Sequence, residues 1–197
     1  MKQPQKLFGV SHVSSQNEAL NKFVVTSGEE GILVTTGALI SASGNTIPHF
    51  LIFPWVHFKD HILVEAPLDT LGLAQPIGWM TAFLFVEVMK HFIQHTSSSL
   101  DNPSLLIFDN HDSHLSLEVI NLAKTYRVEI ITLPPHSSNK LQPLDVRVFG
   151  PFQTYDRAAH DSWMIRNPGK TFSIYNVAEC IEIAHAKAMT GKHSGSF

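Results

Sequence analysis

The sequence predicts an α/β protein in which one mixed sheet is flanked by helices on both faces. Residues 31–54 hold two apolar, β-branched runs separated by a short turn, which is typical of an antiparallel hairpin. Residues 104–134 hold a short apolar strand, a segment of helical period and a second strand, which is typical of a β-α-β unit with parallel strands. A hairpin followed by a parallel unit is unlike a plain doubly wound fold, in which most strands are parallel.

The N-terminal region is polar apart from the predicted hairpin. Residues 7–15 ("LFGVSHVSS") are compatible with a short strand, and 27–31 ("SGEEG") are typical of a turn. Gly-Asn within "SASGNT" is a hairpin signal, so antiparallel strands are expected at about 32–41 and 46–53. Pro48 falls near the start of the second strand, where its missing N–H is tolerable if that strand lies at an edge.

The first predicted helix follows a long connection. Residues 55–79 have no sustained apolar period and several turn residues. From Thr81 onward, residues of the buried type recur every three or four positions, and Thr81 is itself a suitable N-cap. The positions that carry this period are Phe83, Leu84, Val88, His91, Phe92 and His95.

The C-terminal half alternates strands and helices. Strands are expected at 104–109 and about 128–134, with a helix at 115–126 between them. Two further helices are expected at about 144–163 and 175–190, before a ragged tail at about 190–197. Together with the hairpin, these elements fit a ribonuclease H-like arrangement, and we expect residues 1–197 to form a single domain.

Composition narrows the class of protein. The chain has 197 residues, of which 44% are hydrophobic and 16% charged, and this is typical of a soluble globular protein. Its formal charge of -3 argues against a surface that grips nucleic acid all over, although a local basic patch is compatible with it. The single cysteine, Cys180, excludes an internal disulfide and fits a reducing compartment. Since neither a signal peptide nor a membrane span is recognisable, we expect an intracellular or nuclear protein.

Two carboxylates follow predicted strands. Asp109 ends the strand at 104–109, and Asp145 closes the polar segment after the next strand. Ligands of open α/β sheets bind outside the carboxyl ends of the strands, and Mg²⁺ commonly takes one or two protein carboxylates. Two such ions can activate an attacking oxygen and stabilise the leaving oxygen of a phosphodiester. The alternative is that Asp109 caps a turn and Asp145 caps a helix, positions that Asp favours.

Histidines near these carboxylates allow other interpretations. Asp109, His111, His114 and His136 are residue types that bind Zn²⁺, but no H-E-x-x-H pattern accompanies them. Ser and His beside Asp suggest a hydrolase triad, but no G-x-S-x-G motif occurs. Residues 136–170 carry five basic against three acidic side chains, which is a mild sign of a phosphate-facing surface and equally typical of a solvated helix face. The candidate nucleic-acid contacts are His111, His114, His136, Lys140 and Arg147.

Three motifs carry a resemblance to a known family. The stretches "LLIFDNHDSH", "LPPHSSNKLQPLDVRVFGPF" and "GWMT" resemble the DDE superfamily endonuclease domain of pogo, Tigger and Jerky-type transposases, and the resemblance runs from about residue 28 to 190. It implies a ribonuclease H-like fold, cleavage and joining of DNA that depends on Mg²⁺ or Mn²⁺, and a nuclear setting. It also implies that Asp109 is the second acidic residue of the catalytic triad and Asp145 the third.

The sequence departs from the family at the first acidic residue. In the family this residue stands on the opening strand, in a stretch resembling D-E-T-G, whereas no Asp occurs here before Asp60. We therefore expect a fragment without that strand and without the amino-terminal helix-turn-helix region. Such a fragment would bind metal and nucleic acid weakly and would be inactive in cleavage. The alternative is a domesticated, non-enzymatic module for protein contacts in chromatin. Besides DNA, the expected partners are a second copy of the chain or a chromatin protein, and no association with a membrane is expected.

Overall fold

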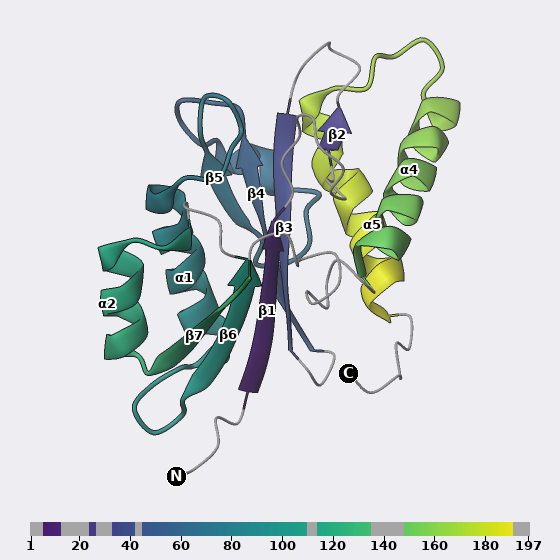
Figure 1. The fold of residues 1–197 in the computed structure, drawn as a ribbon. Coiled ribbons are helices and arrows are strands. Elements are labelled where there is room, and N and C mark those ends of the chain that lie inside the picture. Colours follow the sequence, from purple (N-terminus) through teal and green to yellow (C-terminus); the bar gives the residue numbers. More distant parts are fainter. Residues whose placement is uncertain are drawn as a thin grey trace.

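The computed structural model describes residues 6–12, 24–26, 33–41, 45–109, 114–134 and 148–190 (Figure 1). Within these ranges, seven strands form one mixed sheet in the order β5-β4-β3-β1-β6-β7, with β2 paired to β3. The strands are β1 Lys6–His12, β2 Val24–Thr26, β3 Leu33–Ser41, β4 Thr46–Phe53, β5 Leu71–Ala74, β6 Ser104–Asp109 and β7 Val128–Leu133.

Strand directions bring most carboxyl ends to one edge of the sheet. β3 is antiparallel to both β1 and β4, so β1 and β4 point the same way. β5 is parallel to β4, β6 is parallel to β1, and β7 is parallel to β6. The carboxyl ends of β1, β4, β5, β6 and β7 therefore share an edge. The predicted antiparallel hairpin and parallel pair in one sheet are both confirmed.

Four helices of the described residues cover the two faces of the sheet (Figure 1). α1 (Ala82–Thr96) and α2 (Leu117–Thr125) lie on one side, and α4 (Phe149–Arg166) and α5 (Val177–Thr190) lie on the other. Two short 3₁₀ helices, η1 (Asp60–Leu63) and η4 (Ile174–Asn176), lie in the connections. The predicted helices are all present, and Thr81 caps α1 as expected, since its hydroxyl accepts the Leu84 N–H at 3.3 Å.

Successive side chains of β4 point to opposite faces of the sheet and contribute to a separate core on each face. Phe50 and Ile52 pack with α1 and α2, whereas Leu51 and Phe53 pack with α4 and α5. All four side chains are fully buried, and burying one such side chain contributes about 1.5–3 kcal/mol. A strand that is buried on both faces has a continuous apolar sequence. The apolar run of β4 therefore allowed the hairpin to be predicted from the sequence.

Two parts of the fold differ from the prediction. Residues 55–79, expected to be an irregular connection, contain β5, whose four residues are too few to show a period. Pro48 does not lie on an edge strand, because β4 has a neighbour on each side. Its missing N–H is tolerated because β5 pairs only with the later residues Phe50–Phe53. Instead the Pro48 carbonyl interacts with Nε2 of His91 at 2.9 Å.

No helix of the described ranges is both long and apolar enough to cross a membrane.

Candidate active site

Asp109 is the last residue of β6, at the edge where the parallel strands end. Its backbone pairs with Leu133 of β7, and the preceding residue, Phe108, pairs with Val10 of β1. The end of β6 therefore lies inside the sheet, between two parallel neighbours. Substrates of α/β sheets bind outside such ends, so the backbone position of Asp109 agrees with its predicted role.

The strand beside Asp109 is β1, with the sequence "KLFGVSH". Since Val10 pairs with Phe108, continuing the register by one residue brings Ser11 alongside Asp109. Residues 6–12 include neither Asp nor Glu, so β1 contributes no carboxylate to this edge. A short strand within 7–15 was foreseen, but its central place in the sheet was not. The expectation that the first acidic residue of the family lies on a strand upstream stays a prediction.

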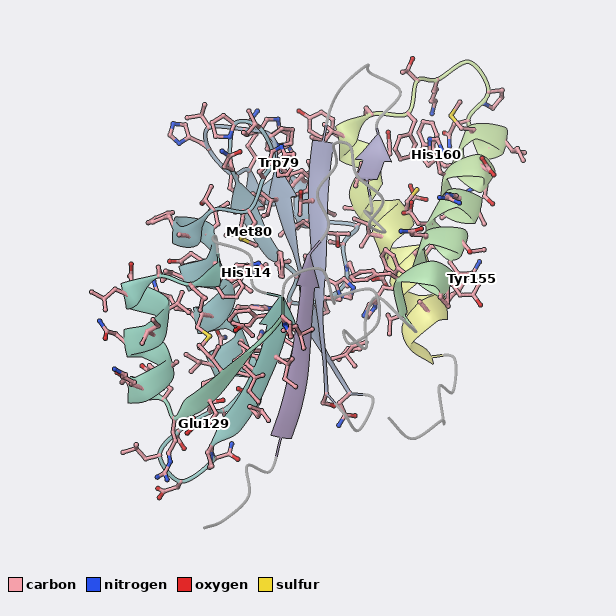
Figure 2. The ribbon with its side chains drawn as sticks, in the orientation of Figure 1. Trp79, Met80, His114, Glu129, Tyr155 and His160 are labelled. Carbon is pink, nitrogen blue, oxygen red and sulfur yellow. The ribbon has the colours of Figure 1, made fainter. Side chains whose placement is uncertain are left out.

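His114 lies in the core and not on a surface that nucleic acid can reach, which corrects the prediction that it contacts nucleic acid. Its side chain is fully buried, with its ring centroid 4.5 Å from that of Phe85 and 5.3 Å from that of Phe108 (Figure 2). The flat imidazole fills a space between α1 and the end of β6. Because it lies five residues after Asp109, it anchors the return of the chain from the candidate site into the core.

The other predicted site residues lie outside the described residues. They are His111, His136, Lys140, Asp145 and Arg147. The distance between the Asp109 and Asp145 carboxylates, the zinc interpretation and the proposed phosphate contacts therefore stay predictions. Within the described ranges, no group of three or more His, Cys, Asp or Glu side chains is arranged to hold a metal ion.

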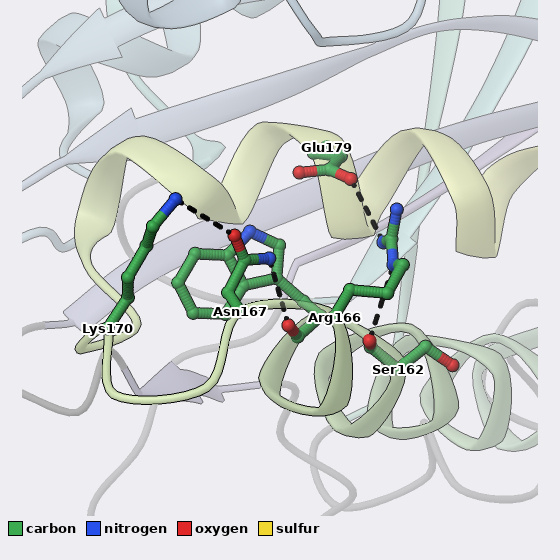
Figure 3. Close-up of polar contacts among 6 residues, drawn as sticks. Ser162, Arg166, Asn167, Lys170 and Glu179 are labelled. Atoms are coloured by element: carbon green, nitrogen blue, oxygen red, sulfur yellow. Dashed lines mark hydrogen bonds and ion pairs between the residues drawn. The ribbon is translucent and has the colours of Figure 1, made fainter.

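The basic segment that follows is engaged in contacts within the fold. Arg166, at the end of α4, donates from Nη2 to Glu179 Oε1 on α5 at 3.2 Å and from Nε to the Ser162 carbonyl at 3.3 Å (Figure 3). Lys170 donates to the side chain of Asn167 at 3.2 Å. The Arg166–Glu179 contact joins α4 to α5, whereas Lys170 contacts the end of α4. The phosphate-facing surface within 136–170 stays a prediction.

A buried polar cluster lies behind the sheet, between β4, α4 and α5, and the sequence analysis missed it. It comprises His49, Glu182 and His185. Each of these residues has a buried side-chain atom without a hydrogen-bond partner in the described part of the chain. One signal in the sequence could have indicated a buried polar group here. His49 occupies an inward-facing position of β4, whose other inward-facing side chains are apolar.

Burial disfavours the charged forms of His49 and Asp156. Desolvation, with a smaller contribution from His185, lowers the pKa of His49 to about 3. Desolvation also raises the pKa of Asp156 to about 7. At neutral pH this residue therefore contributes less than a full negative charge to the segment 136–170. The cluster lies among the residues that pack α4 and α5 against the sheet.

The strand order and directions are those of a ribonuclease H-like fold. A chain of the simian T-cell lymphotropic virus intasome, solved in complex with PP2A regulatory subunit B56 gamma, aligns with a TM-score of 0.51 and 10% identity over 98% of this chain and 56% of that chain. At this identity the similarity concerns the fold alone. The Mos1 transposase catalytic domain, solved with raltegravir and Mg, aligns at a TM-score of 0.49 with 14% identity over 93% of this chain and 84% of that chain.

The fold is that of a ribonuclease H-like domain, and Asp109 stands at the carboxyl end of one of its interior strands. The family of DDE superfamily endonucleases matches residues 65–192, which is more than half of the sequence. The chain therefore belongs to this family.

Two curated relatives extend the comparison. The MFS-type transporter clz9 of Cochliobolus lunatus is 33% identical over 141 residues, which are 71% of this chain and 15% of that protein. The Pogo transposable element with KRAB domain of Homo sapiens is 22% identical over 157 residues, which are 79% of this chain and 25% of that protein. The chain thus spans a quarter or less of the length of these relatives.

Proposed function

We propose that this chain is the catalytic-core domain of a DDE-type transposase, descended from a pogo-type element, and that it contacts DNA and divalent metal at the carboxyl end of β6. The observation that carries the proposal is the position of Asp109 at the end of a strand flanked by two parallel neighbours, in a chain of this family. A pogo-type origin is supported by the 22% identity to the human Pogo relative. A nuclear setting is proposed on the same basis.

Asp109 and Asp145 would hold the metal. Carboxylate oxygens are the hard donors that Mg²⁺ and Mn²⁺ prefer, so the residue types fit the ion that the family implies. Asp145 lies four positions before Phe149, the first residue of α4, so chain length limits the distance between their Cα atoms to about 14 Å.

The protein groups would position DNA at this edge. A bound divalent ion would supply charge neutralisation at the phosphodiester and lower the pKa of a bound water molecule. The backbone of Asp109 pairs with Leu133 of β7, and that of its neighbour Phe108 pairs with Val10 of β1, so the end of β6 is fixed within the sheet, as in-line phosphoryl chemistry requires.

We further propose that the chain cleaves DNA poorly. β1, one of the two neighbours of β6, includes neither Asp nor Glu, so it adds no carboxylate to this edge. Water can fill a coordination position, but it adds no negative charge and holds the ion less firmly. A misplacement of about 1 Å can cost on the order of 100-fold in rate. The same observation favours the second candidate function, a non-enzymatic module that retains the fold for contacts in chromatin.

The test combines metal binding with cleavage. The purified chain is titrated with Mn²⁺ in a calorimeter and incubated with Mn²⁺ and supercoiled plasmid, beside Asp109→Ala and Asp145→Ala. We expect weak Mn²⁺ binding that either substitution reduces, together with nicking at background level. Asp101→Ala, an exposed carboxylate in the connection before β6, is the matched control and should bind Mn²⁺ as the unmodified chain does.

Two outcomes would contradict the proposal. Mn²⁺ binding that is unaffected by Asp109→Ala and Asp145→Ala would remove the metal site. Nicking by the unmodified chain that Asp109→Ala abolishes would show that a third carboxylate comes from elsewhere, and the expected inactivity would be wrong.

A further inference from the structure

A set of aromatic rings lies beyond the carboxyl end of β4 and plays no part in the site at Asp109. We call Trp55, His61 and Tyr175 the aromatic platform. The ring of Trp55 is stacked on that of Phe53, with centroids 5.2 Å apart and planes inclined by 15°. Tyr175 is 6.2 Å from Trp55, and His61 is stacked 5.9 Å from Tyr175 with planes inclined by 18°. Residues from two distant parts of the chain thus meet in one group of rings.

The platform is firmly attached at its base. Phe53 is fully buried at the end of β4. Phe58, whose centroid is 6.0 Å from that of Phe53, lies over Gly72 of β5 so closely that a Cβ atom there would be 1.9 Å from the Phe58 ring. On the other side, η4 holds Tyr175 between Ser173 and Asn176, which form a reciprocal capping box. The rings are therefore held in position by the core, without depending on a ligand.

The upper part of the platform is open to solvent. Tyr175 is 52% exposed, and both His61 and Lys59 are exposed as well. Lys59 lies over Trp55, with its Nζ atom 5.3 Å from the ring centroid, and it forms no salt bridge with any residue that the structure describes. The platform therefore combines two exposed rings, those of Tyr175 and His61, and an exposed cation with a half-buried Trp55, on which Phe53 stacks and over which Lys59 lies.

Such a combination recognises nucleobases. Aromatic side chains stack on bases regardless of sequence, and a neighbouring cation pairs with the phosphate backbone. The ring faces of a base are accessible only when it is not stacked within a duplex, so the chemistry selects unpaired nucleotides. An apolar protein partner would need only the aromatic rings. The positive charge of Lys59 adds a preference for an anionic partner.

The platform lies on the same edge of the sheet as Asp109. β4 and β6 point in the same direction and are separated by β3 and β1, so three strand spacings of roughly 4.8 Å put them about 14 Å apart across the sheet. Phe108 pairs with Val10, Val10 with Leu39 and Leu39 with Ile47, so the end of β4 lies about five residues, or roughly 17 Å, further along the strand direction, and the two ends are about 22 Å apart. A single strand of a few nucleotides covers this distance. Resting on the proposed function, we propose that the aromatic platform binds unpaired nucleotides that flank the DNA segment held at Asp109.

The experiment measures binding of fluorescently labelled single-stranded and duplex oligonucleotides of equal length by anisotropy. Tyr175→Ala should weaken single-strand binding about tenfold, as expected for the loss of one stacked base, and change duplex binding less than about twofold. Tyr175→Phe keeps the ring and should bind as the unmodified chain does. Tyr126→Ala removes a ring of similar exposure, 41%, at the end of α2 and is the matched control. Thermal unfolding of each variant checks that it folds.

A second readout follows the platform itself. Single-stranded oligonucleotide should quench tryptophan fluorescence, and Trp55→Phe should abolish most of that quenching, whereas Trp79→Phe should not. Equal single-strand affinity in the Tyr175→Ala and Tyr126→Ala variants, or no binding of single strands by the unmodified chain, would overturn the platform. Neither result touches the proposed function, which depends on the Mn²⁺ titrations of Asp109→Ala and Asp145→Ala.

Discussion

The imidazole rings of His49 and His185 meet edge to face between the sheet and α5, with centroids 4.4 Å apart and planes inclined by 87°. His49 belongs to β4 and His185 to α5, so the pair joins the sheet to the helical layer behind it. Burial lowers the pKa of both residues, and for His185 the nearby Glu182 opposes the shift. Both rings therefore pack as neutral groups, and protonation of either would leave a poorly solvated charge in the core.

The first prediction concerns stability in mild acid. The pKa of His49 falls from 6.5 to about 3 on folding, so the unfolded chain binds more protons between these values. Stability from this residue is thus complete above about pH 6.5 and decreases as the pH falls toward 3, by at most about 1.4 kcal/mol per pH unit. Urea unfolding at pH 7 and about pH 4.5 measures the decrease, which should be smaller in His49→Phe.

The matched control for this prediction is His57→Gln, which removes an exposed histidine from the connection after β4. It should retain the acid sensitivity of the unmodified chain. If His49→Phe loses as much stability between the two pH values as the unmodified chain does, His49 is not the buried neutral group that the structure shows.

The second prediction has the opposite sign and concerns Asp156 on α4. Its pKa rises from 3.8 to about 7 on folding, because burial disfavours the carboxylate. The folded chain therefore binds more protons between these values, and stability decreases as the pH rises through this window. Asp156→Asn, which cannot ionise, should gain stability relative to the unmodified chain between about pH 5 and pH 8, by up to a few kcal/mol.

Chemical denaturation at both pH values measures this gain. Asp161→Asn removes an exposed carboxylate from the same helix and should change stability equally at both. A difference between Asp156→Asn and the unmodified chain that is the same at pH 5 and pH 8 would show that Asp156 ionises normally in the folded protein.

The third prediction concerns the backbone of the hairpin. Gly37 of β3 pairs with Phe50 of β4, and a Cβ atom on Gly37 would lie 1.9 Å from the ring of Phe50. Gly37→Ala should therefore destabilise the protein by about 1–3 kcal/mol, because the ring cannot move within a packed core without cost. Phe50→Leu in the same chain should recover part of the loss attributed to the collision.

A second glycine provides the control. At Gly150, in the first turn of α4, a Cβ atom would meet nothing within 4 Å. Gly150→Ala should leave stability unchanged or raise it by about 0.5–1 kcal/mol, because alanine loses less backbone entropy in a helix. Equal effects at the two glycines in thermal and urea unfolding would contradict the close packing of Phe50 on β3.

The fourth prediction tests the position of His114. Since the ring is fully buried between Phe85 and Phe108, His114→Ala should create a cavity and cost about 2–4 kcal/mol in urea unfolding. His95→Ala, a histidine on α1 that is only half-buried, should cost less. A loss of DNA affinity in His114→Ala with unchanged stability would return His114 to the list of contact residues.

Local patterns predicted most of the secondary structure. The helix after Thr81, the strand that ends at Asp109 and the parallel strand that follows were all foreseen, because their periods and caps are encoded within a few residues. β5 was not, because four residues become a strand only through pairing with β4, about twenty positions earlier. The central place of β1 was missed for the same reason, since its sequence alone does not distinguish an edge from an interior strand.

The candidate site divides in a similar way. The sequence by itself determined that Asp109 ends a strand and that its motif belongs to this family, because strand ends and motif spacing are local properties. Only the tertiary structure decided that His114, from the same motif, belongs to the core, since Phe85 arrives from a helix about thirty residues away. It likewise decided the neutral state of His49 and the assembly of the aromatic platform. Burial and ring contacts depend on which distant segments pack together, and one-dimensional spacing carries no record of that.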